Sequence, residues 1–247
     1  MRIAAIVPMR HSSERVPGKN YRPFAGRPLY HHIINSLLAC PQITDVVIDT
    51  DSPTIMADAA EHFPQVKVIE RPERTRGGMV PTNEVLLHDV KQVPANFYLQ
   101  THSTNPLLRA QTISMAIDSF LSNYPTYDSL FSVTRLQTRL WDQQGRAVNH
   151  NPAVLLRTQD LPPIYEENSN LYIFTAQTLE QRRNRIGERP YMFEVDHLEA
   201  TDIDEEVDFQ VAEFLYQGVG GRGSGMPCEI PRPPIPDPRP PTPKETI

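Results

Sequence analysis

A basic loop that contains glycine follows directly on the first apolar run of the chain. Residues 10–20, RHSSERVPGKN, bring Arg10, Arg15 and Lys19 together with the hydroxyl group of Ser13. Gly18 allows a backbone amide of the loop to approach a ligand closely. Such a set holds a phosphate chain through charge-assisted hydrogen bonds. The loop matches neither GxxxxGK(S/T) nor GxGxxG. A solvated basic loop is the alternative, but the position after the first strand favours anion binding.

An acidic segment near residue 200 supplies the opposite charge. In EATDIDEEVDF, Asp202 and Asp204 stand two residues apart, which on an extended segment puts both carboxylates on one face. Two such carboxylates repel each other unless a cation lies between them, and Mg²⁺ binds through carboxylates, substrate phosphates and water. A helix N-terminus that favours acids through its dipole would explain Asp204, Glu205 and Glu206, but not Asp202. The pattern therefore predicts a Mg²⁺ site at Asp202 and Asp204.

The elements that must position these residues alternate along the chain between buried strands and amphipathic helices. The predicted strands are residues 2–8, 45–50, 66–69, 96–101, 129–135, 170–175 and 191–195. The predicted helices are residues 28–39, 53–63, 82–93, 110–122 and 205–216. This alternation predicts an α/β fold with a doubly wound, mostly parallel sheet. Ligands of such sheets bind beyond the carboxyl ends of the strands, which is where the basic loop falls.

The chain divides by composition into one domain and a tail. Residues 1–217 form the predicted domain, which includes an irregular polar stretch, about residues 136–163, with the only tryptophan, Trp141. The closing helix carries Val207, Val211, Phe214 and Leu215, which we expect on its buried face. Residues 218–247 are rich in Gly and Pro and cannot build a core, so we expect a disordered tail.

Charge and cysteine content exclude several classes of protein. The formal net charge is -6, which argues against a protein that binds nucleic acid or a membrane surface through a basic face. The two cysteines, Cys40 and Cys228, indicate neither a disulfide framework nor a CxxC metal site. No segment is typical of a signal peptide or a membrane span. We therefore expect a cytoplasmic protein.

The opening loop resembles a known signature. RxxSxRxPGKN, followed by AGRPL, resembles the first motif of the sugar-activating cytidylyltransferases, which include the CMP-sialic acid and CMP-Kdo synthetases. The resemblance implies a Rossmann-like nucleotidyltransferase fold, similar to GT-A, in which this loop wraps the triphosphate of CTP. It implies nucleotide-binding roles for Arg10, Ser13, Arg15, Lys19 and Asn20. KN after the glycine favours the sialic acid branch and Arg15 the Kdo branch, so the loop leaves the branch open.

Later segments resemble the family in the same order. ERPERTRGGMVPTNE implies nucleotide-binding roles for Arg71 and Thr82, although Gly78 stands where the family usually has aspartate. LQTHSTNPLLR resembles the LQPTSPLR block, with His102 at the place of a glutamine that touches sugar and nucleotide. In the block YEENSNLYIF, Glu166 replaces a family arginine, which indicates an altered sugar site. The implied sugar-binding residues are His102, Ser103, Thr104 and Asn168. We expect Asn105 to cap the helix that follows.

The resemblance also implies a reaction and an assembly. CMP passes from CTP to the anomeric hydroxyl of a 2-keto-3-deoxy sugar acid, and pyrophosphate is released. Catalysis would rest on Arg10 and Lys19, which neutralise phosphate charge, and on Asp202 and Asp204, which hold Mg²⁺. The family commonly forms homodimers, in which residues 136–163 would reach the neighbouring subunit.

Three alternatives stay open at this point. A sister enzyme could use Kdo, legionaminic or pseudaminic acid, and the departures at His102 and Glu166 support this possibility. A GT-A-like glycosyltransferase also combines a nucleotide fold with a metal-binding DxD, although here that motif lies near the C-terminus. A non-catalytic scaffold working through its Pro-rich tail would have little use for the basic loop and the two aspartates.

Overall fold

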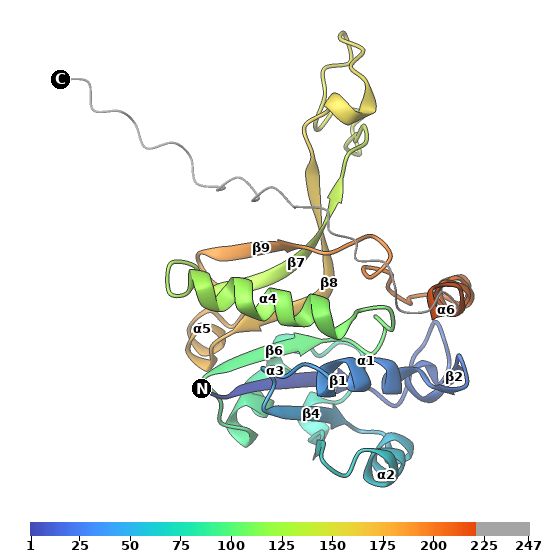
Figure 1. Cartoon of the computed structure of the whole chain (residues 1–247), viewed down its shortest axis with the longest axis vertical. Helices are drawn as coiled ribbons and strands as arrows, with labels where there is room; N and C mark the ends of the chain where they lie inside the picture. The colour runs from blue at the N-terminus through green and yellow to red at the C-terminus, as the bar shows by residue number, and fades with distance from the viewer. Residues whose placement is uncertain (221–247) are drawn as a thin grey trace, which may run out of the picture.

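A seven-stranded sheet forms the centre of the fold. The computed structural model of the chain describes residues 1–220. The strands of the sheet are β1 (Ile3–Met9), β4 (Asp45–Thr50), β5 (Lys67–Glu70), β6 (Phe97–Thr101), β7 (Ser129–Leu136), β8 (Ile164–Phe174) and β9 (Pro190–Glu194). Their order across the sheet is β5-β4-β1-β6-β8-β7-β9 (Figure 1). β8 runs antiparallel to β6 and β7, whereas all other neighbours are parallel. The predicted mostly parallel α/β sheet is confirmed.

Helices cover both faces of the sheet. They are α1 (Leu29–Leu38), α2 (Pro53–His62), α3 (Thr82–Gln92), α4 (Ala110–Asn123), α5 (Ala176–Arg182) and α6 (Glu206–Gly220). Short elements complete the order: β2 (Pro23–Phe24), β3 (Arg27–Pro28) and the 3-10 helices η1 (Lys19–Tyr21), η2 (Glu73–Thr75) and η3 (Thr158–Asp160). The sequence did not predict α5, and it placed the start of β8 at residue 170 instead of Ile164. No helix among residues 1–220 is both long and apolar enough to cross a membrane.

Alternate residues of β1 separate the two cores. Ala5 and Val7 face a core shared with α1, α2 and α4, while Ala4 and Ile6 face a second core shared with α3 and α5. Because side chains of a strand alternate between the two faces, a central strand buried on both sides reads as one apolar run. Each fully buried Val or Ile contributes about 1.5–3 kcal/mol of hydrophobic stabilisation. The two cores therefore fix β1 rigidly, together with the loop that leaves its carboxyl end.

The closing helix α6 is rotated relative to the prediction. Val207, Val211 and Phe214 are 58%, 49% and 74% exposed, whereas Phe209 and Ala212 are buried against the β2–β3 hairpin. Polar contacts fix this rotation. Arg22 forms an ion pair with Glu206 at 2.5 Å and lies over the Phe209 ring, and Ala25 N donates to Glu213 Oε1 at 2.7 Å.

The predicted tail begins later than expected. α6 extends through Gly220, so the first three residues of the predicted tail, 218–220, belong to a helix. The rest of the predicted tail, residues 221–247, lies outside the described residues.

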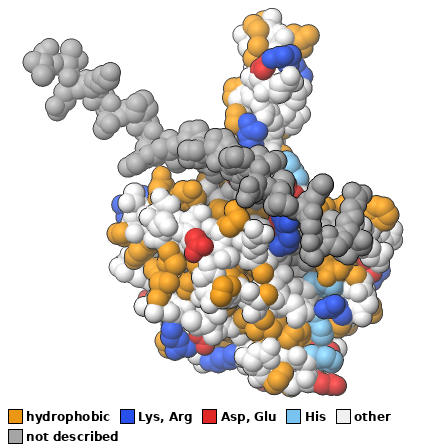
Figure 2. Space-filling model, viewed as in Figure 1, with side chains coloured by type: hydrophobic (Ala, Val, Ile, Leu, Met, Phe, Trp, Pro, Cys, Tyr) orange, Lys and Arg blue, Asp and Glu red, His pale blue; other side chains and the backbone are white. Residues whose placement is uncertain are grey.

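An arm projects from the body between β7 and β8. The two strands pair beyond a bulge near Val133, and residues 137–163 continue as an irregular loop with one antiparallel bridge, Trp141 to Ala147, and η3 (Figure 1). Of the irregular stretch expected at residues 136–163, Leu136 still belongs to β7. Hydrophobic side chains gather at the tip of the arm (Figure 2). Leu155, which belongs to this arm, is 91% exposed.

Candidate functional site

A polar cavity of about 770 Å³ opens at the carboxyl ends of the parallel strands. The chain runs from β1 outward to β4 and β5 and then returns to β6 on the other side of β1. The connections that leave β1 and β6 therefore diverge, which opens a crevice at this switch point. The cavity is lined by the loop after β1, the loop after β6 and the acidic segment near residue 203. Twelve of the thirteen predicted site residues line it: Arg10, Ser13, Arg15, Lys19, Asn20, Arg71, Thr82, His102, Ser103, Thr104, Asp202 and Asp204.

The loop after β1 is shaped by a turn at Gly18. Gly18 has φ +66°, and a Cβ there would lie 2.9 Å from the Tyr21 ring, so the position favours glycine on two grounds. Asn20 Nδ2 donates to the Arg10 carbonyl at 2.8 Å, and Ser103 Oγ donates to Asn20 Oδ1 at 2.6 Å. Asn20 thus links the loop after β1 to the loop after β6. Its buried amide positions the basic side chains around it.

Two cations of this loop meet the acidic segment. Arg15 Nη2 donates to Asp204 Oδ1 at 2.6 Å, and Lys19 Nζ donates to the Ile203 carbonyl. Burial lowers the pKa of Lys19, an effect that the carboxylates of Asp202 and Asp204 oppose. Cationic and anionic groups therefore face one another across the cavity.

The acidic pair offers a donor set that fits Mg²⁺. Burial, and secondarily the Asp204 carboxylate, raises the pKa of Asp202, while a hydrogen bond from Thr104 opposes the shift. Although water reaches both carboxyl groups, the surrounding protein penalises two negative charges in one place. A hard cation that binds oxygen ligands would relieve this penalty. Asp202 and Asp204 offer oxygen ligands next to a basic loop suited to phosphate. They therefore fit the Mg²⁺ ion that the sequence predicts at this place.

Arg71 sits on a buried pair of carboxyl groups, those of Asp49 and Asp89. Its guanidinium is 3% exposed and donates to Asp49 Oδ1 and, at 3.4 Å, to the Asp49 carbonyl. Asp89 lies next to Asp49, and the Oδ2 atoms of both lack a partner as long as both are ionised. Burial and the neighbouring Asp49 raise the pKa of Asp89 to about 8. A proton on Asp89 joins the two carboxyl groups and leaves one negative charge to hold Arg71.

The end of the cavity away from the basic loop contains three side chains linked by hydrogen bonds. Arg185 Nη1 donates to Gln100 Oε1 at 2.5 Å, and Gln100 Nε2 lies 3.0 Å from His102 Nε2. Burial, with Arg185 as the second cause, lowers the pKa of His102 to about 3. His102 is therefore neutral at pH 7, and the Gln100 amide donates to its Nε2. Arg185 also lies 3.6 Å above the centre of the Tyr172 ring.

Arg185 and Gln100 were missed for different reasons. Gln100 is a polar residue within an apolar strand, next to the predicted block, and this position could have identified it. Arg185 lies in a surface connection after α5, a helix that the sequence did not predict, so no local pattern marks it.

Two other residues that the sequence singled out lie outside the cavity lining. Asn168 is turned into the sheet, where it accepts from Ser132 Oγ at 2.5 Å and donates to Thr134 Oγ1 at 2.9 Å, and Ser169 lines the cavity instead. Glu166 is exposed on β8 outside the cavity lining.

The expected cap at Asn105 is wrong. α4 begins at Ala110, its N-cap residue Arg109 makes no side-chain cap, and Asn105 Nδ2 lies 3.4 Å from Asp202 Oδ1. Asn105 lies five residues before the start of α4, too far to cap the helix, and supports the acidic segment instead.

The departure at Gly78 lies within the cavity. A Cβ at this position would lie 3.1 Å from Arg10 Nη1 and 3.4 Å from Glu14 Oε1. The absence of a side chain lets the Arg10 guanidinium lie close to the backbone here.

A second cavity, of about 850 Å³, lies between α1, α4 and residues 194–199. None of the residues predicted to carry chemistry lines it. Its Arg109 already pairs with the buried carboxylate of Glu199. The first cavity is therefore the better candidate for a catalytic site, because it combines basic side chains suited to phosphate with a pair of carboxylates.

Comparisons with known proteins identify relatives of the chain. A family model described as cytidylyltransferase matches residues 4–222. CMP-N,N'-diacetyllegionaminic acid synthase of Legionella pneumophila is 29% identical over 233 residues, which cover 88% of this chain and 97% of that protein. Pseudaminic acid cytidylyltransferase of Campylobacter jejuni is 23% identical, covering 88% and 97%. N-acylneuraminate cytidylyltransferase A of Danio rerio is 26% identical, and the match covers 91% of this chain but 53% of that protein.

Solved structures show the same fold. A CMP:2-keto-3-deoxy-manno-octonic acid synthetase complexed with CTP superposes with a TM-score of 0.66 at 14% identity and covers 89% of this chain and 100% of that one. A 4-diphosphocytidyl-2C-methyl-D-erythritol synthase from Anaerococcus prevotii gives 0.64 at 11% identity, covering 87% and 96%. At these identities the likeness concerns the nucleotidyltransferase fold alone.

Proposed function

Since the chain belongs to the cytidylyltransferase family, we propose that it transfers CMP from CTP to the anomeric hydroxyl of a nonulosonic acid. The acid would be sialic acid or a relative such as a diacetylated legionaminic acid. One observation carries the proposal. The basic loop after β1 and the acidic pair near residue 203 line one cavity at the switch point of the sheet. This arrangement suits a nucleoside triphosphate with its metal better than a free sugar nucleotide.

The phosphate end of the cavity supplies positive charge to the leaving group. The anomeric oxygen attacks the α-phosphorus, the bond to the β-phosphate bridging oxygen breaks, and pyrophosphate takes the electron pair of that bond. The hydroxyl proton passes to solvent. Arg10 and Lys19 neutralise the charge that develops on pyrophosphate, with Arg15 beside them. An opposite charge at 4 Å in a partly screened site stabilises such a transition state by about 4 kcal/mol before desolvation.

Asp202 and Asp204 would hold Mg²⁺ close to the phosphates. A bound Mg²⁺ supplies positive charge to the phosphate oxygens and favours the ionised form of a nearby hydroxyl. Thr104 and Asn105 orient the Asp202 carboxylate for this task. The proposed transfer of CMP to the sugar acid needs no other cofactor.

The opposite end of the cavity fits the sugar acid. Arg185 has no carboxylate partner among the described residues, so its positive charge is available to the carboxylate of the substrate. The neutral His102 then presents a ring nitrogen to a sugar hydroxyl. Ser103 and Thr104 lie between the two ends of the cavity. Asn168 would act on the sugar indirectly, since its amide anchors the strand next to Ser169.

We also propose that the protein is a cytoplasmic homodimer in which the arm at residues 137–163 reaches the second subunit. Several of its apolar side chains are largely exposed within the described chain. They are Trp141, Val148, Val154, Leu155 and Leu156, each 40% or more exposed. A projecting apolar tip of this kind marks an interaction surface.

Pyrophosphate release tests the proposed reaction. The full chain is incubated with CTP, Mg²⁺ and one acid from a panel of N-acetylneuraminic, diacetyllegionaminic, pseudaminic and 2-keto-3-deoxy-octonic acids. ATP and UTP serve as controls. We expect release with CTP and a nine-carbon acid. Preferential release with the eight-carbon acid would contradict the proposed substrate, and failure to bind CTP would contradict the reaction itself.

A further inference from the structure

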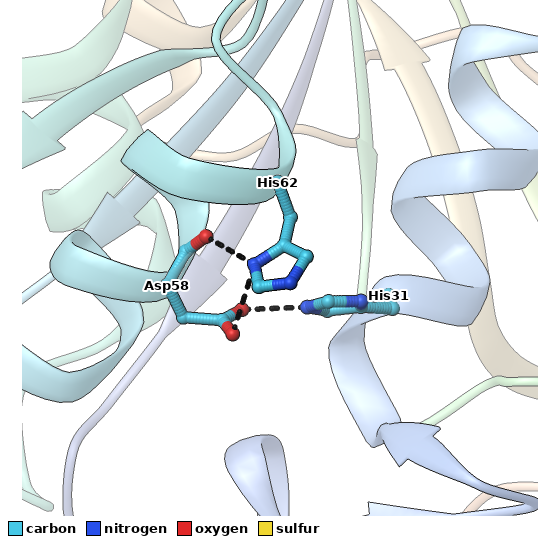
Figure 3. Close-up of side chains that lie close together, drawn as sticks. All are labelled: His31, Asp58 and His62. Carbon is cyan, nitrogen blue, oxygen red and sulfur yellow. Dashed lines mark hydrogen bonds and ion pairs between the residues drawn. The ribbon is translucent and has the colours of Figure 1, made fainter.

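Two histidines and an aspartate meet where α1 and α2 pack together, outside the cavity lining. His31 belongs to α1, while Asp58 and His62 lie one turn apart on α2. Both imidazole rings are turned toward the Asp58 carboxylate (Figure 3). His31 Nε2 lies 2.5 Å from Asp58 Oδ2, and His62 Nδ1 lies 3.3 Å from Asp58 Oδ1. One carboxylate therefore joins two imidazoles that come from neighbouring helices.

The spacing of these groups fits a metal ion. The potential ligand atoms of the three residues all lie within 4.8 Å of one another. Ligand atoms of a tetrahedral zinc site, with bonds of about 2.0–2.1 Å, are roughly 3.3 Å apart. The distances within the cluster, from 2.5 Å up to no more than 4.8 Å, bracket this separation.

Exposure increases in steps from the inner to the outer ligand. The side chain of His31 is 8% exposed, that of Asp58 24% and that of His62 50%. The inner end of the cluster is thus fixed by packing, and the outer end is open to entering ions. Water can occupy the remaining coordination position, as in zinc sites with three protein ligands.

Neighbouring groups fix the orientation of the three potential ligand side chains. Tyr30 donates its hydroxyl to Asp58 Oδ2, and the His31 ring packs edge-on against the Tyr30 and Phe63 rings. His62 Nδ1 lies 3.0 Å from the Asp58 carbonyl, so the tautomer that donates this bond keeps a lone pair on the other ring nitrogen. Outer contacts of this kind orient metal-binding histidines in proteins.

The donor set selects a different ion from the proposed catalytic one. Two imidazole nitrogens and one carboxylate oxygen suit zinc and its neighbours in the first transition row, whereas Mg²⁺ prefers oxygen ligands alone. Within residues 1–220 one other group has similar spacing, namely Asp49, His88 and Asp89. It offers less to a cation, because Asp49 already pairs with the buried guanidinium of Arg71.

We propose that His31, Asp58 and His62 form a binding site for a zinc-class divalent cation that joins α1 to α2. The site is independent of the proposed reaction. Because its ligands come from two helices and the cation needs all of them, the bound ion stabilises the folded chain relative to the unfolded one.

Titration of the full chain with Zn²⁺ tests this site. The protein is stripped with a chelator and titrated by calorimetry at about pH 7.5, without CTP or Mg²⁺. We expect one high-affinity Zn²⁺ per chain and a rise in Tm on binding. His62→Ala and Asp58→Asn should each weaken binding by about 100-fold or more. Co²⁺ in place of Zn²⁺ should give visible absorption that His62→Ala abolishes.

Two controls separate this site from other histidines and from the catalytic acids. His197→Ala removes another exposed histidine, and Asp204→Asn removes a proposed Mg²⁺ ligand. Both variants should keep the affinity for Zn²⁺. His62 is half exposed, so its removal should leave the Tm of the metal-free protein unchanged. Equal Zn²⁺ affinity in His62→Ala and the unsubstituted chain, or no high-affinity binding at all, would overturn the proposal.

Discussion

Arg15 and Asp204 stand 189 residues apart in the sequence, yet they form an ion pair of 2.6 Å within the cavity. Their side chains are 61% and 52% exposed, so the pair contributes less than about 1 kcal/mol to stability. Little free energy is therefore needed to break the pair when a triphosphate binds Arg15 and a metal binds Asp204. The pair therefore balances one cation and one carboxylate of the cavity lining without competing strongly with the proposed substrates.

The acidic pair gives the first prediction. Asp204→Asn removes a proposed Mg²⁺ ligand, and pyrophosphate release should fall by about 100-fold or more, because several kcal/mol of charge stabilisation are lost. The matched control is Glu205→Gln, which changes the adjacent exposed carboxylate and should keep most of the activity. Comparable rates in the two variants across a Mg²⁺ titration would remove Asp204 from the metal site.

A second prediction concerns the ammonium group of Lys19. Lys19→Met removes a proposed phosphate-binding charge and should raise the Kd for CTP by about 10- to 100-fold, as expected for the loss of a charged hydrogen bond. Calorimetry with CTP measures this change directly. Lys91→Met, at the exposed end of α3, should bind CTP like the unsubstituted chain. An unchanged Kd in Lys19→Met would contradict the phosphate role.

Arg185, at the end of the cavity away from the basic loop, should affect the KM values of the two substrates differently. Arg185→Gln should raise the KM for the sugar acid by about tenfold or more and leave the KM for CTP nearly unchanged, because the lost cation faces the carboxylate. Arg183→Gln is the control, since Arg183 lies nearby but pairs with Glu84. If Arg185→Gln impairs CTP binding instead, CTP and the sugar acid occupy the cavity ends opposite to those proposed.

The buried carboxyl pair predicts how stability depends on pH. Asp89 has a folded-state pKa of about 8 and an ordinary value near 3.8 when unfolded, so the folded state holds an extra proton between these pH values. The free energy of unfolding should therefore decrease as pH rises from about 4 to about 8, by at most about 1.4 kcal/mol per pH unit, and level off above.

Asp89→Asn tests this dependence with little change in shape. The amide donates to Asp49 as the protonated acid does, without titrating, so the variant should lack this decrease and gain stability relative to the unsubstituted chain as pH rises. Urea unfolding between about pH 5 and 9 measures both curves. Glu61→Gln, an exposed acid on α2, should follow the unsubstituted chain. Parallel curves for Asp89→Asn and the unsubstituted chain would show that Asp89 is ionised in the folded protein.

The arm predicts the oligomeric state. Leu155→Asp places a charge in the proposed apolar contact and should convert the dimer to a monomer, as measured by light scattering after gel filtration. Phe214→Asp alters an exposed apolar residue of α6 and should leave the dimer intact. A monomer before any substitution, or a dimer that survives Leu155→Asp, would contradict the proposed contact.

Sequence patterns predicted most of the site because its residues follow strands. Lys19, His102 and Asp202 were identified from short segments whose place in the sheet was clear, and the cavity brings them together. Arg185 could not be found this way, because its position depends on how a surface connection folds over the β8 end of the sheet. Asn168 shows the converse, since a sheet bulge turns its amide inward and no local pattern encodes that bulge.

The buried face of α6 could not be read from its apolar residues alone. Val207, Val211 and Phe214 share one side of the helix and would suit a core. The small hairpin that receives the helix instead offers Arg22 and a free backbone amide, which pair with the glutamates of the other side. Tertiary polar contacts thus outweighed the hydrophobic pattern at an edge of the fold where little core is available.

The closure of the cavity by two distant segments has a consequence for how the protein is made. A ribosome releases the basic loop early, whereas Asp204, its partner, emerges 189 residues after Arg15. During most of synthesis the cations therefore lack the acidic segment opposite them. Both charged sides of the cavity are present only once the segment between β9 and α6 has been made, so the site cannot form in shorter chains.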